Sequence, residues 1–217
     1  MDLFLVPDNP EHTTLVSTNG VAHYQVNTSK SRHGGRRRTR IQRPAESHEA
    51  SIVAEVDWGT WDAPTVVRSS LLSVNGRGCI LRVPAPGALG KGMGVLATDF
   101  LYKKSQFSSS RYFIGDDAKE YRWKAVKGVG IVLCNSQTNE EVARYTCTLT
   151  SEGLYAGERK SRLRIQPCSV DIDMIVLSFL IMEKKRREKA GEGSAMMIYY
   201  DEDPKGDGGA DVDGGGS

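Results

Sequence analysis

The stretch from Val170 to Lys189 constrains the fold of this chain more than any other. From Met174 to Met182 every residue is apolar except Ser178, so a helix built from this run has no polar face. A helix that is apolar on every side must be surrounded by protein or by lipid. Crossing a bilayer takes about 20 apolar residues, and this run is far shorter. The sequence therefore predicts a helix enclosed by protein, and no transmembrane segment.

The two ends of this stretch favour a helix over a buried strand, which periodicity alone does not separate. Asp171 and Asp173 suit a helix N-terminus, and either Ser169 or Asp171 is placed to cap it. The run 183–190 is rich in helix formers and in basic residues that suit a C-terminus. We therefore predict a helix over about 171–189, buried in its first half and solvated in its second.

The residues before this helix predict short strands joined by tight turns. Asn19-Gly20 between apolar runs is a strong hairpin signal. The segment Ser51–Trp58 alternates as a half-buried strand does, with Ala54 and Val56 on one face and Glu55 and Asp57 on the other. Further strands are expected at 13–16, 21–26, 65–68, 71–74, 79–83, 100–103, 111–114, 119–125, 131–134, 141–148 and 162–165.

Closely spaced short strands followed by one apolar helix predict a mainly β domain over residues 1–190. The expected architecture is a closed antiparallel β-barrel around the central C-terminal helix. Residues 29–49 are predicted to be a flexible basic insertion, in which only 39–41 suits a short strand. The acidic, glycine-rich residues 191–217 are predicted to form a disordered tail.

The overall charge excludes little, because a net charge of +2 over 217 residues does not predict a nucleic-acid partner. The N-terminus carries no basic segment and no long apolar core, so no signal peptide is expected. The cysteines match no zinc spacing and predict a reduced, intracellular protein, with a disulfide or a metal site as the alternative. These residues are Cys79, Cys134, Cys147 and Cys168, of which Cys134 and Cys147 are expected to be small core residues.

The sharpest local signal is a run of cations that begins in residues 29–30 and contains no acid until Glu46. These candidate ligand residues are Lys30, Arg32, Arg36, Arg37, Arg38, Arg40 and Arg43. Near an anionic membrane each such charge contributes about 1 kcal/mol of attraction. Nucleic acid is a less favoured partner, since these charges would contact phosphates without recognising bases. The run also matches a nuclear-localisation signal. A solvated loop with no specific role is the alternative.

No catalytic residue, cofactor or metal ligand is predicted. The four histidines lie in the first quarter of the chain, and no serine stands in a G-x-S-x-G motif. Asp116-Asp117 reads as a solvated turn, and Tyr121 and Trp123 as core aromatics. The predicted function is a non-enzymatic binding or adaptor module for anionic phosphate surfaces such as lipid head groups, in the cytoplasm or nucleus. The alternatives are a protein-interaction scaffold, or an enzyme with its site inside or at the mouth of the barrel.

Four segments carry a resemblance to known proteins: MDLFLVPDNPEHTTLV and NGVAHYQV near the start, YFIGDDAKEYRWK in the middle, and VDIDMIVLSFLIMEKKRRE at the end. They resemble a family of uncharacterised domains abundant in mushroom-forming fungi, in which Tyr121-Arg122-Trp123-Lys124 is the most recognisable mark. That resemblance covers most of residues 1–189 and implies no activity.

The layout also resembles, more distantly, the tubby-like fold of tubby C-terminal domains, phospholipid scramblases and LURP-one-related proteins. This second resemblance implies a closed barrel around a hydrophobic helix. It is architectural, so no phosphoinositide-binding or calcium-binding residue is carried over. The basic insertion 29–49, the glycine-rich loop 84–94 and the segment after the helix depart from that pattern.

Overall fold

The computed structural model describes residues 1–30, 37–60, 63–72, 80–81, 94–106 and 108–189. Its strands are β1 (Asp2–Val6), β2 (His12–Ser17), β3 (Ala22–Lys30), β4 (Arg37–Gln42), β5 (Ile52–Asp57), β6 (Val66–Arg68), β7 (Ile80–Leu81), β8 (Gly94–Leu96), β9 (Arg111–Ile114), β10 (Glu120–Val126), β11 (Gly130–Asn135), β12 (Glu141–Leu149) and β13 (Arg159–Ile165). The helices are α1 (His48–Ser51), α2 (Ala97–Phe100) and α3 (Ile172–Lys189), with a 3-10 turn, η1 (Ser70–Leu72).

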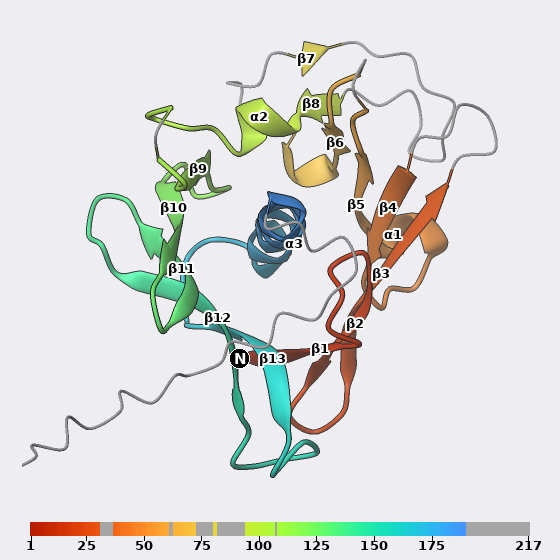
Figure 1. The fold of residues 1–217 in the computed structure, drawn as a ribbon. Helices are drawn as coiled ribbons and strands as arrows, with labels where there is room; N and C mark the ends of the chain where they lie inside the picture. Colours follow the sequence, from red (N-terminus) through yellow and green to blue (C-terminus); the bar gives the residue numbers. More distant parts are fainter. Residues whose placement is uncertain (31–36, 61–62, 73–79, 82–93, 107, 190–217) are drawn as a thin grey trace, which may run out of the picture.

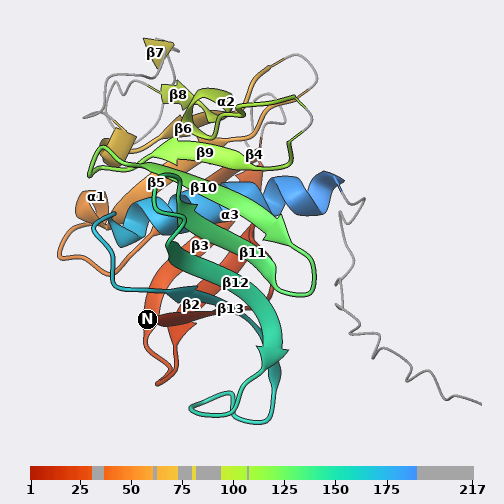
Figure 2. The same ribbon diagram turned by 90° about the vertical axis from the view of Figure 1, so that its left-hand side faces the viewer.

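These strands form one antiparallel sheet in the order β7-β8-β6-β5-β4-β3-β2-β1-β13-β12-β11-β10-β9. Figure 1 looks along α3 and shows the sheet curving around it, and Figure 2 shows the helix running inside the sheet from one end to the other. The pairing of β1 with β13 joins the first and last strands of the chain in the middle of the sheet. The predicted mainly β fold with a C-terminal helix is therefore confirmed.

The predicted closure of the barrel is not confirmed. Within the described residues the hydrogen-bonded order ends at β7 on one side and at β9 on the other. Figure 1 shows α2 between β8 and β9, and after α2 the chain makes an isolated bridge from Tyr102 to Tyr112. The strand expected at 100–103 is wrong, because the Leu101 N–H donates to the Ala97 carbonyl and closes a helical turn. The chain therefore reaches the bridge at Tyr102 through a helical turn and not through a strand.

The apolar run of α3 is buried as predicted. Ile175, Val176 and Phe179 are fully buried, and each side chain of this kind contributes about 1.5–3 kcal/mol through burial. Ser178, the polar residue of the run, accepts a hydrogen bond from Trp123 Nε1 at 3.0 Å and donates to the Ile175 carbonyl at 3.0 Å. Its hydroxyl is therefore satisfied inside the core, and the run has no solvent-facing side.

The N-terminus of α3 is capped by Asp171, one of the two predicted candidates. The Asp171 carboxylate accepts from the Asp173 N–H at 2.8 Å, and its own N–H donates to Asp116 at 2.8 Å. The buried Asp173 carboxylate accepts from the Tyr24 hydroxyl at 2.7 Å and pairs with Arg43. These contacts connect the start of the helix to β3 and to the segment after β4.

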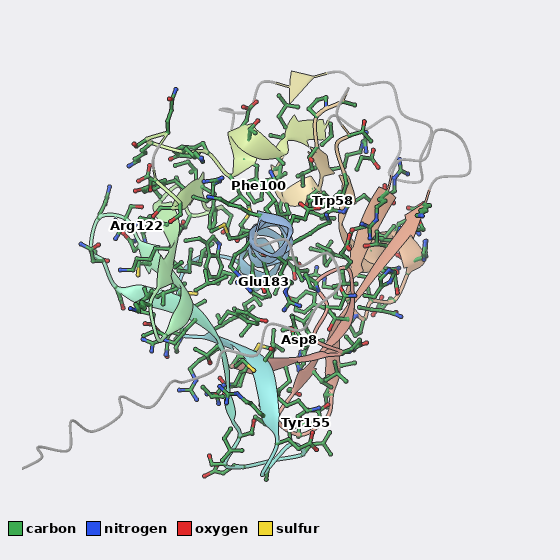
Figure 3. All side chains as sticks on the ribbon, viewed as in Figure 1. Asp8, Trp58, Phe100, Arg122, Tyr155 and Glu183 are labelled. Carbon is green, nitrogen blue, oxygen red and sulfur yellow. The ribbon has the colours of Figure 1, made fainter. Side chains whose placement is uncertain are left out.

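Most predicted strands are present, and the core aromatics are confirmed. Trp123 and Tyr121 are buried, and Figure 3 shows Trp58 and Phe100 on the helix side of the sheet. Two strands were missed: the apolar lead-in at residues 2–6 is β1, near the middle of the sheet, and residues 94–96 form β8. The strand expected at 71–74 is wrong where the structure describes it, since residues 70–72 form η1. The tail predicted at 191–217 lies outside the described residues.

Candidate functional site

The basic run lies largely in a regular strand, which corrects the predicted flexible insertion. Residues 37–42 form β4 and pair with β3 on one side and with β5 on the other. The inner-face residues Thr39 and Ile41 are buried, and they anchor this segment in the sheet. Lys30 ends β3 and is exposed, while Arg32 and Arg36 lie outside the described residues. The two buried side chains therefore fix which face of β4 points into the core, and its arginines lie around them.

The outer-face arginines of β4 are paired with carboxylates of the next strand. Arg38 Nε lies 2.5 Å from Asp57 Oδ1, and Arg40 NH2 lies 2.8 Å from Glu55 Oε1. Asp57 also pairs with Arg68 of β6. These acids lie in β5, outside the basic run, so the sequence of the run by itself does not reveal that its arginines have carboxylate partners. Their presence leaves less of this charge available to an external phosphate.

The other two described arginines of the run connect the sheet to the ends of α3. Arg37 donates to Glu11 at 2.7 Å, and the other carboxylate oxygen of Glu11 lies 3.6 Å from Lys184 in the last turns of the helix. Arg43 pairs with Asp173 in the first turn. Arg37, Arg38, Arg40 and Arg43 thus all have carboxylate partners within the chain.

The Asp57 pairs predict a contribution to the pH dependence of stability. Burial would raise the pKa of the Asp57 carboxyl, but hydrogen bonds from Arg38 and Arg68 outweigh it, so the pKa lies below its ordinary value. Such a carboxyl stabilises the folded state above its unfolded-state pKa of about 3.9, and this stability is lost as pH falls through the folded-state pKa. We expect Asp57→Asn to narrow the difference in unfolding free energy between about pH 6 and pH 2, measured by urea titration.

The matched control for Asp57→Asn is Glu158→Gln, because the Glu158 side chain is 56% exposed and pairs with Lys160 at the surface. This variant should keep the wild-type difference in unfolding free energy between the two pH values, since exposed ion pairs contribute about 0–1 kcal/mol to stability. If Asp57→Asn shows the same difference in unfolding free energy between the two pH values as the wild type, this carboxylate does not contribute to the acid sensitivity.

A second cluster of charges lies where α3 leaves the sheet. The fully buried Glu183 accepts from Arg186 at 2.7 and 2.8 Å and from Arg187 at 2.7 Å. Arg187 also donates to Asp8 Oδ1 at 2.6 Å and to the Tyr145 hydroxyl at 3.0 Å. Figure 3 shows Glu183 and Asp8 on the inner side of the sheet. We refer to these five residues as the helix-end network.

Beside the helix-end network, Lys184 is buried against Trp58, with its ammonium 4.1 Å from the ring centroid. It also pairs with Glu188, one turn further along the helix. Lys184, like the arginines of the helix-end network, thus has a carboxylate partner. The predicted solvated second half of the helix is therefore wrong for residues 183 and 184, since burial continues two residues past the apolar run.

The helix-end network does not have the properties of an acid–base centre. Burial raises the pKa of the Tyr145 hydroxyl, and the charges of Glu183 and Asp8 raise it further, so the hydroxyl stays protonated. The Ser161 hydroxyl donates to Asp8 at 2.6 Å, and Arg187 donates to the other oxygen of the same carboxylate at 2.6 Å, so an ion pair already holds the Asp8 charge. Burial also raises the pKa of the Cys168 thiol, which disfavours the nucleophilic thiolate. Among the described residues, no group of three or more His, Cys, Asp or Glu side chains could hold a metal ion.

The free cysteines of the described chain are Cys134, Cys147 and Cys168. Cys134 is buried, as expected for a small core residue, whereas Cys147 is only half-buried and Cys168 is exposed. Cys79 lies outside the described residues. The core assignment is therefore confirmed for Cys134 and wrong for Cys147.

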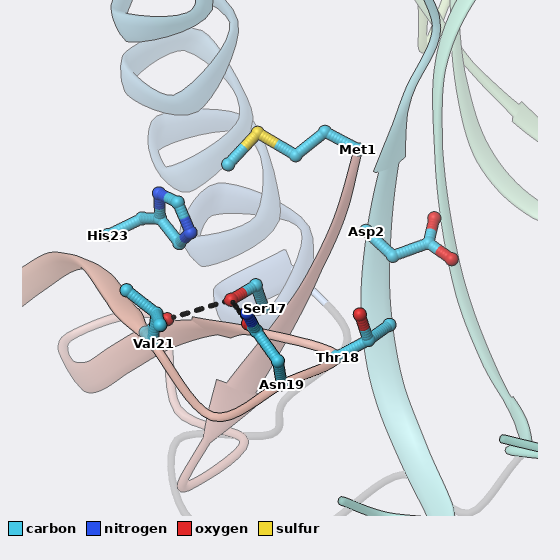
Figure 4. A pocket seen from close by; sticks show the side chains of 7 residues that line it. All are labelled: Met1, Asp2, Ser17, Thr18, Asn19, Val21 and His23. Carbon is cyan, nitrogen blue, oxygen red and sulfur yellow. Dashed lines mark hydrogen bonds between the residues drawn. The ribbon is translucent and has the colours of Figure 1, made fainter. Parts of the chain in front are cut away.

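A hollow of about 420 Å³ opens near the N-terminus (Figure 4). Its lining is Met1, Asp2, Ser17, Thr18, Asn19, Val21 and His23. Several polar groups here have partners within the chain: Ser17 Oγ lies 2.5 Å from Asn19 Oδ1, and the N-terminal ammonium donates to the Ile165 carbonyl at 2.7 Å. Asp2 is held by Arg162 and Arg164. The hollow lacks a convergent set of free polar groups of the kind that defines a small-molecule site.

The charge of the chain is divided unevenly along the sequence. Residues 1–189 hold 28 lysines and arginines against 20 acids, a formal net charge of +8, whereas residues 190–217 hold one lysine against seven acids. The overall charge of +2 conceals this division. Charge counted by segment would have indicated this excess of cations in residues 1–189.

The described residues contain no helix with the length and apolarity needed to cross a bilayer. No curated protein and no solved structure matches the chain. A family profile matches residues 8–188, which include every described strand except β1 and nearly all of α3. On this match the chain belongs to the Family of unknown function (DUF6593).

Proposed function

We propose that this chain is a non-enzymatic binding module for anionic phosphate surfaces, with lipid head groups as the ligand. The observation that carries the proposal is the charge of +8 on residues 1–189, separated from an acidic C-terminal segment. A surface of one sign attracts an oppositely charged layer, and near an anionic membrane each cation contributes about 1 kcal/mol. The attraction needs no pocket, which is consistent with the shallow hollow described above.

The connection between β3 and β4 is the contact that we propose. Lys30 ends β3 and is exposed, and Arg32 and Arg36 follow it in the sequence. The remaining candidates could bind a phosphate only by breaking their ion pairs within the chain. These are Arg37, Arg38, Arg40 and Arg43. The proposal therefore gives Lys30, Arg32 and Arg36 the larger part of the binding energy.

A second cationic surface on β10 provides a matched comparison. Arg122 and Lys124 alternate with the buried Tyr121 and Trp123, so they occupy the outer face of the strand, where Figure 3 shows Arg122. Lys127 follows in the turn and is exposed. Neutralising these three side chains removes the same charge as neutralising Lys30, Arg32 and Arg36.

The test is co-sedimentation of the full chain with vesicles of phosphatidylcholine alone and with added phosphatidylserine. We expect binding to the anionic vesicles at low salt and its loss near 1 M salt, where the Debye length falls from about 10 Å to about 3 Å. The triple variant Lys30→Gln, Arg32→Gln, Arg36→Gln should lose most of the binding, and Arg122→Gln, Lys124→Gln, Lys127→Gln should keep more. Equal losses would contradict the assigned location, and no binding at low salt would contradict the function.

The second candidate function is a protein-interaction scaffold. Three large apolar side chains are strongly exposed: Leu149 at 71%, Leu154 at 62% and Val21 at 51%. Leu154 lies against the β2–β3 turn that precedes Val21: its N–H donates to the Thr18 carbonyl at 3.0 Å, and its side chain approaches Gly20. Exposed apolar groups that cluster in this way are typical of interaction sites. If the vesicle assay and a parallel duplex-DNA gel shift both show no binding, the scaffold becomes the favoured function.

We also propose a fungal origin and a distant relationship to the tubby-like fold. The support is the resemblance of the quoted segments to the fungal domains, together with a curved antiparallel sheet around a C-terminal apolar helix. A relationship of fold supports a function only by analogy. The lipid proposal therefore depends on the charges of this chain, and the vesicle assay tests it directly.

A further inference from the structure

The outer face of β9 to β13 carries a group of cations that neighbouring strands bring together. Figure 2 looks onto this face, with α3 behind the strands. In each strand the residues that alternate with these cations are buried: Trp123 in β10, Tyr145 in β12 and Leu163 in β13. The outer-face cations are Arg122 and Lys124 of β10, Arg144 of β12, and Lys160, Arg162 and Arg164 of β13.

The pairing of the strands places several of these cations in one row. Arg144 stands directly opposite Arg164 in the ladder of β12 and β13. Lys124 is opposite Val132 of β11, which is in turn opposite Arg144. The row therefore crosses four strands, which lie about 4.8 Å apart. Like charges directly opposite each other in a ladder repel, so an anion that spans the row would relieve this repulsion.

The acids of this face balance only part of its positive charge. Glu141 and Asp2 pair with the outer-face arginines of β12 and β13. Arg122 donates to the Asn139 amide oxygen at 3.0 Å. Within the described part of the chain, neither Arg122 nor Lys124 has a carboxylate partner. The unbalanced charge is therefore concentrated on β10, next to the edge strand β9.

Two tyrosine rings lie on the same face at this edge. Tyr112 of β9 stands opposite Arg122 in the ladder, and its ring stacks on that of Tyr102, with 5.9 Å between the centroids and 25° between the planes. The two tyrosines also exchange backbone hydrogen bonds of 2.9 Å, and the Tyr102 hydroxyl donates to Glu120. These contacts hold the pair of half-buried rings beside the cations of β10.

Lys104 covers the ring of Tyr112 and is only weakly held there. Its ammonium lies 4.6 Å from the ring centroid and 2.6 Å from Glu120 Oε2, and 52% of its side chain is exposed. Exposed pairs of this kind contribute little to stability, so a planar ligand can displace the ammonium from the ring at little cost. The displaced ammonium would remain close enough to meet an anionic group of that ligand.

We propose that the outer face of β9 to β13 binds single-stranded nucleic acid, with a base stacked on Tyr112 and phosphates along the cations. Proteins that bind single strands combine these two elements, cations that follow the backbone and aromatic rings on which bases stack. A lipid surface and an acidic protein segment match the charge but offer no base, and a duplex keeps its bases stacked inside. The face lies apart from the β3–β4 connection, so this inference does not depend on the lipid proposal.

The experiment measures binding of the full chain to fluorescein-labelled oligouridylate by fluorescence anisotropy over a range of salt concentrations. Each phosphate contact with a single strand contributes about 0.7 to the slope of the log association constant against log salt, so Arg122→Gln, Lys124→Gln should reduce that slope by about 1.4. The control Lys30→Gln, Lys189→Gln removes the same charge at exposed positions elsewhere. It should leave the slope unchanged.

Substitution of Tyr112 tests stacking separately from charge. Tyr112→Leu should weaken binding by at least about fivefold without changing the salt slope, because it removes a stacking ring and no charge. Tyr112→Phe keeps the ring and should bind as the wild type does. The control is Tyr155→Leu, since Tyr155 also has a lysine over its ring, Lys160 at 4.9 Å from the centroid, but lies in the β12–β13 loop. It should keep the wild-type affinity.

An abasic strand gives the same test with the wild-type protein, whether or not Tyr112→Leu folds. It keeps the phosphates and lacks the bases, so it should bind at least about fivefold more weakly than oligouridylate. Equal affinity for the two strands would overturn the proposal, as would an unchanged salt slope in Arg122→Gln, Lys124→Gln. Tighter binding of a duplex of the same length, or equal competition by polyglutamate, would overturn it in favour of a duplex or an acidic protein.

The outcomes are separate from those of the vesicle assay. Lys30 belongs to the proposed lipid contact, and Lys30→Gln, Lys189→Gln should still bind oligouridylate. Failure of vesicle binding with retained binding of the single strand would overturn the lipid proposal alone. Failure of the wild type to bind oligouridylate at low salt would overturn this inference and leave the lipid proposal standing.

Discussion

Ile175→Asn is expected to unfold much of the protein at room temperature. Ile175 is fully buried in α3 and packs inside the sheet. Removing its aliphatic atoms costs about 2–5 kcal/mol through lost burial and cavity formation, and an amide without partners in the core costs about 1–3 kcal/mol more. Proteins of this kind are stable by about 5–15 kcal/mol. Urea unfolding followed by tryptophan fluorescence measures the change, since Trp123 lies against the same helix.

The matched control is Ile172→Asn, the same substitution one turn earlier on the same helix. Ile172 is 38% exposed, so the new amide remains in contact with water and little packing is lost. We expect its unfolding free energy to stay within about 1 kcal/mol of the wild type, as is usual for surface positions. Similar losses at the two positions would contradict the central placement of the helix.

The sequence was most informative where a segment has one physical solution. The run 174–182 has no polar face, so it must be enclosed, and the residues at its two ends favour a helix over a buried strand. Asp171 was recognisable as one of two candidate caps because capping is local, and the N–H group that donates to its carboxylate is only two residues away. Trp123 and Tyr121 were recognisable as core residues because strand alternation fixes the face on which they lie.

The basic run was misread because the partners of its arginines lie far along the chain. Glu55 and Asp57 follow in the next strand, and Asp173 is 130 residues from Arg43. A cluster of cations without local acids looks like an exposed binding loop, and only the pairing of β4 with β5 shows where its counter-charges are. Thr39 and Ile41 were the local indication of a strand, but two buried residues are too few to define one from sequence.

Closure of the sheet was not predictable for a different reason. Whether a sheet closes depends on the positions of both of its edge strands, and the sequence does not identify which strands form the edges. The residues Ala97–Phe100 form a helical turn instead. A run this short is ambiguous between strand and helix, so the outcome depends on how α2 packs between β8 and β9.

Glu183→Gln is the second variant with a large expected effect. The Glu183 carboxylate is fully buried and is the partner of both Arg186 and Arg187. Neutralising it leaves partly buried guanidinium groups without this counter-charge. Breaking a buried pair on one side costs about 3–5 kcal/mol, mostly because the remaining charge is left uncompensated. The measurement is the unfolding free energy at neutral pH from urea titration.

The control for Glu183→Gln is Glu141→Gln, because Glu141 forms the same kind of pair with an arginine three residues later. The Glu141 and Arg144 side chains are 29% and 41% exposed, so water screens the pair and its loss should cost less than about 1 kcal/mol. The double variant Glu183→Gln, Arg186→Gln should recover part of the loss, since it removes one of the uncompensated charges together with its partner. If Glu183→Gln costs no more than Glu141→Gln, the helix-end network does not stabilise the position of α3, and apolar packing alone holds the helix inside the sheet.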